Sequence, residues 1–85
     1  MYRLQWVNSA SREFLSAAAN ASPAQRQIIM TALSDIERLL VVQPDTAGES
    51  REPGTRFIFI SPLAITFHVN ARLKVVLISR ANIRN

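Results

Sequence analysis

The residues best suited to chemistry in this chain are its single histidine and the arginines on either side of it. Thr66 and His68 are two positions apart in an alternating segment, so their side chains should share one face of a strand. Arg56 and Arg80 lie on segments that could flank them. Forked arginine contacts grip phosphate and stabilise charge that develops at phosphorus, and a histidine moves protons near neutral pH. We therefore interpret Arg56, His68 and Arg80 as candidate catalytic residues.

Charge is divided unevenly along the chain. The net charge is +4, and all six acidic residues precede Pro53. A field of one sign in one part of a domain concentrates anionic partners. A solubilising surface has the same composition, so charge alone leaves both interpretations open. The basic residues that would extend the candidate site as nucleic-acid contacts are Arg51, Arg72, Lys74 and Arg84.

Composition excludes several other kinds of site. Without cysteine and with one histidine, the sequence offers no disulfide and no evident metal site. Gly48 and Gly54 are the only glycines, so no glycine-rich phosphate loop exists, and no acid follows His68 to complete a serine–histidine–acid triad. The longest apolar runs, 39–42 and 57–60, are too short to span a bilayer. We expect a cytoplasmic protein with no cofactor, no metal and no membrane partner.

The first half of the chain predicts one strand and two helices. Residues 2–7 alternate as a half-buried strand does, and Asn8 and Ser9 offer caps for a short first helix. Residues 22–25 read Ser-Pro-Ala-Gln, which combines a capping box with proline at the first helical position. Apolar residues at helical spacing follow until Pro44. Because few residues separate the two helices, they should form an antiparallel hairpin.

The second half changes to a period of two and predicts strands joined by short turns. Strands with such short links pair in antiparallel fashion, and the helices should cover one face of their sheet. We expect an α+β domain over residues 1–85 with an N-terminal strand, a helical hairpin and three to four antiparallel strands. The predicted strands are Gly48–Arg51, Thr55–Ser61, Leu63–Val69 and Leu73–Arg80.

This assignment distributes side chains between the two faces of the sheet. The open face should carry Arg56, Thr66, His68 and Arg80. The core should hold the large aromatic residues, which are Trp6, Phe57, Phe59 and Phe67.

The whole arrangement resembles the RelE/ParE superfamily of toxins from type II toxin–antitoxin systems. The resemblance covers nearly the full length. It rests on the opening strand, the hairpin ending near Pro44, the Gly-Glu-Ser-Arg turn at residues 48–51 and the strands Thr55–Ile60, Ile65–Val69 and Val75–Ser79. It implies a toxin whose basic surface is masked by a cognate antitoxin. The target would be mRNA at the ribosome, cut by a metal-independent endoribonuclease, or DNA gyrase.

The resemblance transfers to individual residues only in part. Ribonuclease members carry basic side chains on the strand at Thr55–Ile60, where Arg56 matches but Ile58 does not. Ala64 stands where they usually have an arginine, and Arg84, together with Arg80, stands near their final basic or tyrosine residue. These departures keep two alternatives open. One is a non-catalytic or degenerate toxin-like binding module, including a homodimer, and the other is a basic nucleic-acid binder unrelated to toxins.

Overall fold

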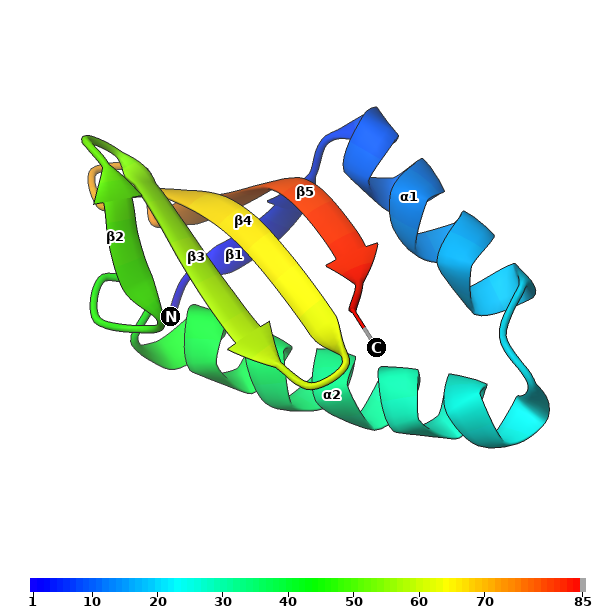
Figure 1. Cartoon of the computed structure of the whole chain (residues 1–85). Coiled ribbons are helices and arrows are strands. Elements are labelled where there is room, and N and C mark those ends of the chain that lie inside the picture. Colours follow the sequence, from blue (N-terminus) through cyan, green and yellow to red (C-terminus); the bar gives the residue numbers. More distant parts are fainter. Residues whose placement is uncertain (85) are drawn as a thin grey trace.

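The computed structural model describes residues 1–84 and places two helices against a five-stranded sheet (Figure 1). The α+β arrangement predicted from the sequence is confirmed. The elements in chain order are β1 (Arg3–Trp6), α1 (Asn8–Ala19), α2 (Pro23–Val42), β2 (Glu49–Glu52), β3 (Thr55–Ile60), β4 (Leu63–Asn70) and β5 (Val75–Ile83).

The sheet is mixed, with the strand order β1-β5-β4-β3-β2. β2 to β5 pair in antiparallel fashion, as their short links predicted. β1 instead pairs with β5 in parallel, from Arg3 opposite Val75 to Trp6 opposite Ile78. A parallel pair needs a long crossover connection, which the two helices contribute to here. Alternation within β1 could not reveal this partner, because alternation reports faces and not neighbours.

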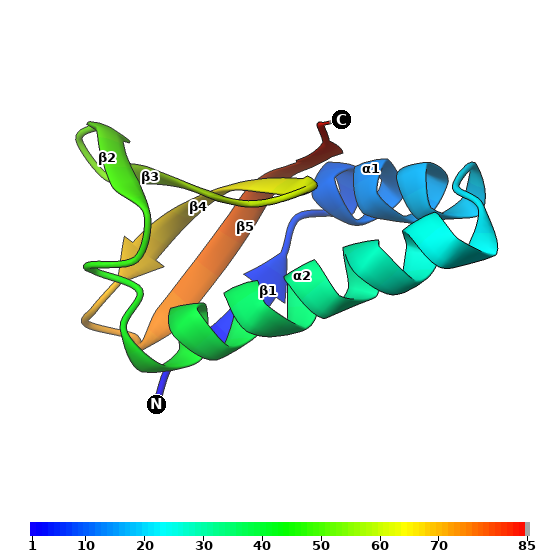
Figure 2. The same cartoon turned by 60° about the horizontal axis from the view of Figure 1, so that its bottom comes forward.

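The two helices diverge from their connection and cover different parts of the sheet (Figures 1 and 2). α1 packs on β5, whereas α2 contacts β1, β3 and β4. The two helices follow one another in the chain as predicted. They do not pack against each other as a hairpin, however, because each helix packs mainly on strands. Within residues 1–84, neither helix is both long and apolar enough to cross a membrane.

The two helices begin in different ways. The Ser22 side chain accepts a hydrogen bond from the Gln25 backbone at 3.1 Å, and the Gln25 side chain accepts one from the Ser22 backbone at 3.0 Å, which confirms the capping box. The caps predicted at Asn8 and Ser9 are wrong, because Val7 is the N-cap and no side chain caps α1. The Val7 N–H donates to Ile78 O at 3.0 Å, so the chain passes from strand contact straight into the helix.

The core lies between the helices and one face of the sheet. Trp6 borders it, with its ring edge-on to Phe14 at 5.8 Å, and Phe67 is completely buried. The core positions predicted for Phe57 and Phe59 are wrong, since they lie on the opposite face and Phe59 is 46% exposed. The largest fully buried side chains are Phe67, Ile36, Leu40, Leu63, Ile65, Ile78, Val76 and Pro44.

Candidate functional site

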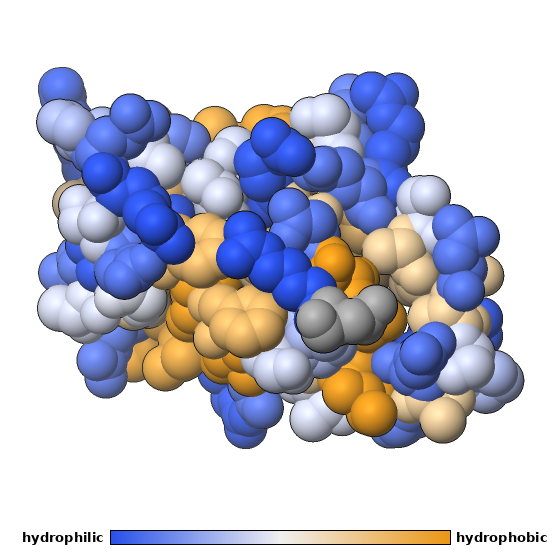
Figure 3. All heavy atoms as spheres, in the orientation of Figure 1, coloured by the Kyte–Doolittle hydropathy of each residue, from blue (hydrophilic) through white to orange (hydrophobic). Residues whose placement is uncertain are grey.

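The open face of the sheet carries a hollow of about 470 Å³ that we call the basic hollow. Opposed residues of antiparallel strands share a face, and Thr66 stands opposite both Phe57 and Arg80. Figure 3 shows hydrophobic side chains over β3 with hydrophilic ones along their border. The lining residues are Arg51, Thr55, Phe57, Ala64, Thr66, Arg80, Asn82 and Arg84.

Arg80 reaches this face because β5 contains a bulge. Thr66 stands opposite Arg80 while Phe67 stands opposite Ile78, so Ser79 is an extra residue on β5. With strict alternation Arg80 would share the buried face of Ile78, and the extra residue turns it outward instead. The Ser79 hydroxyl donates to Thr66 O at 3.3 Å across the irregularity. Arg80 thus lines the open face, as predicted, although the bulge was not foreseen.

A carboxylate from α1 holds Arg80 in place. Glu13 accepts hydrogen bonds from Arg80 Nε at 3.3 Å and Nη2 at 3.1 Å, and also from the Ala81 backbone N–H at 3.2 Å. The Ala81 N–H and then the Arg80 guanidinium lower the pKa of Glu13. α1 lies beside the part of β5 that β1 does not pair with. Sequence reasoning missed Glu13, because nothing local links it to a strand so distant in the chain.

Two arginines flank Phe57 in the basic hollow. The guanidinium carbons of Arg51 and Arg84 lie 4.5 and 5.1 Å from the ring centroid, within cation–π range. Arg51 also pairs with Glu49 at 2.8 Å. Phe57 therefore holds both guanidinium groups at the surface. Its role was missed because β3 is apolar on both faces, so alternation cannot choose between them.

Arg56 does not reach the basic hollow. It stands opposite Phe67, whose side chain is in the core, and so points to the helix side of the sheet. Its Nε donates to Ala47 O at 3.0 Å and its Nη2 to Gly48 O at 3.3 Å. The prediction that Arg56 and Arg80 share the open face is wrong. Arg56 instead fastens the loop between α2 and β2.

His68 lies on the open face but belongs to a second hollow, together with Arg3, Gln5 and Arg72. Its Nδ1 is 3.0 Å from Gly54 O. A carbonyl oxygen only accepts, so Nδ1 carries a proton and donates it to Gly54 O. His68 thus lines a different hollow from Arg51, Arg80 and Arg84, and its Nδ1 also lies 3.3 Å from Oγ1 of Thr55, which lines the basic hollow.

Two predicted nucleic-acid contacts lie outside the basic hollow. Arg72 lines the second hollow, and Lys74 occupies the β4–β5 turn with φ of 57°. The Lys74 ammonium lies 4.9 Å from the centroid of the Tyr2 ring. Of the predicted site residues, the basic hollow therefore gathers only Arg51, Arg80 and Arg84.

This geometry suits anion binding better than acid–base chemistry. No histidine, aspartate or glutamate is among the residues that line the basic hollow. The described part of the chain contains no group of three potential metal ligands. Asn82 Oδ1 is buried and has no hydrogen-bond partner within residues 1–84. Guanidinium, hydroxyl and amide groups hold and orient an anionic partner without transferring its protons.

The sequence matches no family model and no curated protein. The fold, in contrast, matches solved structures along its length. A chain of the chromosomal ParDE toxin–antitoxin system from P. aeruginosa superposes with a TM-score of 0.75 and 20% identity, covering 100% of this chain and 98% of that one. A chain of the toxin–antitoxin complex RelBE2 from Mycobacterium tuberculosis gives 0.72 and 17%, covering 98% and 91%.

The isolated E. coli RelE toxin gives a TM-score of 0.68 with 15% identity, and the match covers 100% of this chain and 86% of that one. The class of fold is thereby settled: this chain has the RelE/ParE-like fold that its sequence resembled.

Proposed function

We propose that this chain is the toxin of a type II toxin–antitoxin pair and that it acts in the cytoplasm. The observation that carries the proposal is the correspondence of the whole fold to the ParDE and RelBE chains. A basic hollow on the open face supports it, because a toxin directed at nucleic acid or a nucleoprotein needs a cationic surface. The cognate antitoxin is the expected protein partner.

The toxin acts by binding its target and not by cutting RNA. Ribonucleolytic cleavage needs a base for the attacking hydroxyl and an acid for the leaving oxygen. The basic hollow has neither, His68 lies in the second hollow, and Arg56 is used inside the fold. Arg51 and Arg80 are each paired with a carboxylate, which leaves Arg84 as the side chain freest to contact an anion. A non-cleaving action favours DNA gyrase over mRNA as the target.

Induced expression in a bacterial host tests the toxin proposal. We expect growth arrest that is relieved by the protein encoded in the neighbouring reading frame. Arg84→Ala should abolish arrest while lowering the free energy of unfolding by no more than about 1 kcal/mol, because the side chain is exposed and loses only its contact with the Phe57 ring. Arg72→Ala is the matched control and should retain arrest. Harmless expression of the wild-type chain would contradict the proposal.

Two assays separate the modes of action. Transcripts from arrested cells should stay intact, while purified protein should inhibit supercoiling by DNA gyrase and Arg84→Ala should not. Fragmented transcripts in a translating extract, lost in Arg84→Ala or Arg80→Ala, would refute the non-cleaving mode and leave the toxin proposal standing.

A further inference from the structure

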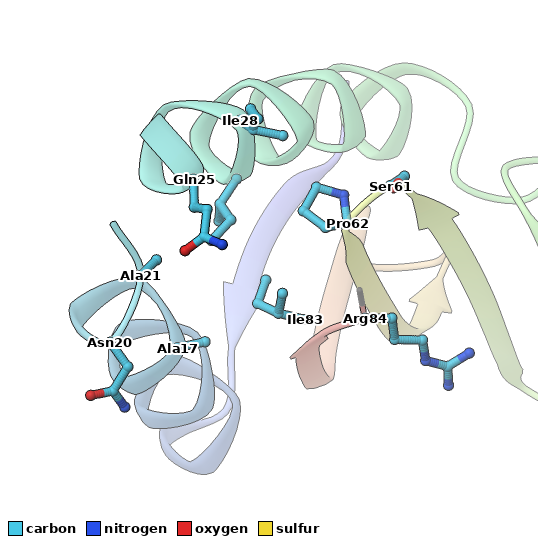
Figure 4. Close-up of a pocket in the computed structure, with 10 residues that line it drawn as sticks. Ala17, Asn20, Ala21, Gln25, Ile28, Ser61, Pro62, Ile83 and Arg84 are labelled. Atoms are coloured by element: carbon cyan, nitrogen blue, oxygen red, sulfur yellow. The ribbon is translucent and has the colours of Figure 1, made fainter. Parts of the chain in front are cut away.

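The groove beside the two helices and the second hollow on the open face differ in charge. The groove has a volume of about 450 Å³, and Arg84 is the only charged residue that lines it (Figure 4). In this view the Arg84 side chain points away from Ile83. The second hollow has a volume of about 680 Å³ and is lined by two arginines and the histidine but by no acid. The second hollow therefore holds positive charge that its own lining does not neutralise.

The second hollow has an apolar floor between two polar borders. Val75 and Leu77 form this floor and are half-buried on β5. Since β5 lies between β1 and β4, side chains of those two strands border the floor on opposite sides, roughly 10 Å apart. The volume falls within the range of about 300–1,000 Å³ that is typical of small-ligand sites. The width of the floor suits one flat ring lying on it.

One end of the floor carries groups that suit the polar edge of such a ring. Gln5 and His68 both stand opposite Leu77, one on each side of it. The His68 ring is held through Nδ1, which lies 3.0 Å from Gly54 O and 3.3 Å from Thr55 Oγ1. Nε2 is therefore the ring nitrogen left for a ligand. The Gln5 carboxamide both donates and accepts hydrogen bonds, so the two side chains can pair with the edge of a heteroaromatic ring.

The other end of the floor, beside the β4–β5 turn, carries positive charge. Arg72 lies in this turn, and the Arg3 backbone N–H donates to Lys74 O of the same turn at 2.9 Å. Within residues 1–84 neither Arg3 nor Arg72 forms an ion pair. Arg51 and Arg80 of the basic hollow, in contrast, are each paired with a carboxylate. Two unpaired guanidinium groups at one end of a hollow suit a phosphate group.

We propose that the second hollow binds a free mononucleotide, with its base on Leu77 and its phosphate at Arg3 and Arg72. The apolar floor and the cationic end are separated by two residues of β5, or about 7 Å, which leaves room for the sugar. Asn70 Oδ1 accepts a hydrogen bond from the Leu73 N–H at 3.0 Å, and this contact holds the turn that carries Arg72. The site is distinct from the basic hollow and goes beyond the proposed function.

Titration of the isotope-labelled chain, followed by NMR in phosphate-free buffer, tests this site. The chain has a single histidine, so the ring signal of His68 is identified directly. We expect AMP, GMP, CMP or UMP to shift this signal and the backbone signal of Leu77, with Kd below about 1 mM for at least one of the four. The matching nucleoside and inorganic phosphate should each bind at least about tenfold more weakly, because each lacks half of the contacts. Absence of a saturable shift with all four nucleotides would overturn the proposal.

Substitutions test the phosphate end of the site. Arg3→Gln and Arg72→Gln should each weaken nucleotide binding by about tenfold and leave nucleoside binding unchanged, since each removes a forked contact to phosphate. Arg12→Gln is the matched control, because it removes the same charge from an exposed residue of α1 that lines neither hollow. Thermal melts of the three variants should coincide with wild type, as all three side chains are exposed. An equal loss of binding in Arg12→Gln would indicate a general effect of charge and overturn the proposal.

A short oligothymidylate separates a free nucleotide from a nucleotide within a strand. If the strand shifts the His68 signal and no mononucleotide does, the ligand is a nucleic acid and the proposal is overturned. Growth arrest is measured separately: Arg84→Ala should lose arrest and keep nucleotide binding, whereas Arg72→Gln should keep arrest and lose nucleotide binding. Failure of nucleotide binding would leave the toxin proposal standing, and harmless expression would leave the nucleotide site standing.

Discussion

Replacing Arg56 by alanine tests whether this arginine serves the fold or the target. Its side chain lies on the helix side of the sheet and donates to Ala47 O and Gly48 O. Arg56→Ala should therefore lower the stability of the domain without removing any group from the basic hollow. The same substitution would abolish activity without unfolding the domain if Arg56 contacted the target, as its sequence position suggested.

The expected loss follows from the two hydrogen bonds. The bond to Ala47 O is 3.0 Å long and partly buried, whereas the bond to Gly48 O is 3.3 Å long and exposed. A charged donor contributes about 1.5–3 kcal/mol in a protected site and less when water competes, so we expect about 2 kcal/mol in total. For a domain of this size that loss lowers Tm by roughly 8–16 °C. Arg56→Lys should recover no more than about half, because an ammonium cannot reproduce the fork.

Urea unfolding followed by far-UV circular dichroism provides the measurement. The urea concentration at the unfolding midpoint should be lower in Arg56→Ala than in wild type. The slope m should not change, since the two proteins expose similar surface on unfolding. Arg72→Ala, an exposed control, should stay within about 0.5 kcal/mol of wild type. Growth arrest should persist in Arg56→Ala at temperatures where it is folded. A wild-type midpoint combined with lost arrest would refute our assignment of this side chain.

Two further substitutions address the same framework. Gly48→Ala should destabilise by more than about 2 kcal/mol, because φ is +64° and a Cβ would lie 2.1 Å from a backbone oxygen of β3. Gly54 has φ of +82°, and a Cβ added there would have no atom within 4 Å, so Gly54→Ala should lose only the stability that corresponds to backbone strain. Equal losses of stability in Gly48→Ala and Gly54→Ala would contradict this account. In wild type the ionised Glu13 stabilises the folded state fully above the pKa of an unfolded glutamate, about 4.3, and this stabilisation is lost as pH falls through the lowered pKa of the folded state. Glu13→Gln should remove this pH-dependent contribution. Urea midpoints across pH measure this, and parallel profiles for the two proteins would contradict it.

Features that depend on neighbouring residues were predictable from the sequence. The start of α2 follows from Ser22, Pro23 and Gln25, whose contacts span a single turn. β3 and β4 follow from alternation between turn-forming residues, and their ends agree closely with the expected ones. Local chemistry thus determined the elements and, with the short links between strands, most of their pairing.

Features that depend on distant partners were not predictable in this way. The bulge at Ser79 arises where β5 meets β4, and it reverses the face of every later residue, including Arg80. Phe57 and Ile58 are both large and apolar, so only the packing of α2 decides which of them is buried. Glu13 accepts hydrogen bonds from Arg80, which lies 67 residues further along the chain. The candidate site depends on such contacts between residues that are distant in the sequence. Alternation within β3 therefore could not show that Arg56 lies on the helix side of the sheet.

β5 is the last strand of the chain, yet it lies between β1 and β4 in the sheet. During synthesis β1 is made before both helices and β2 to β4, and its partner β5 is made after all of them. Arg80 belongs to β5 and Arg84 follows it, so the basic hollow cannot assemble before β5 has been made. A nascent chain in which β5 has not yet been made therefore lacks the surface that we assign to the toxin.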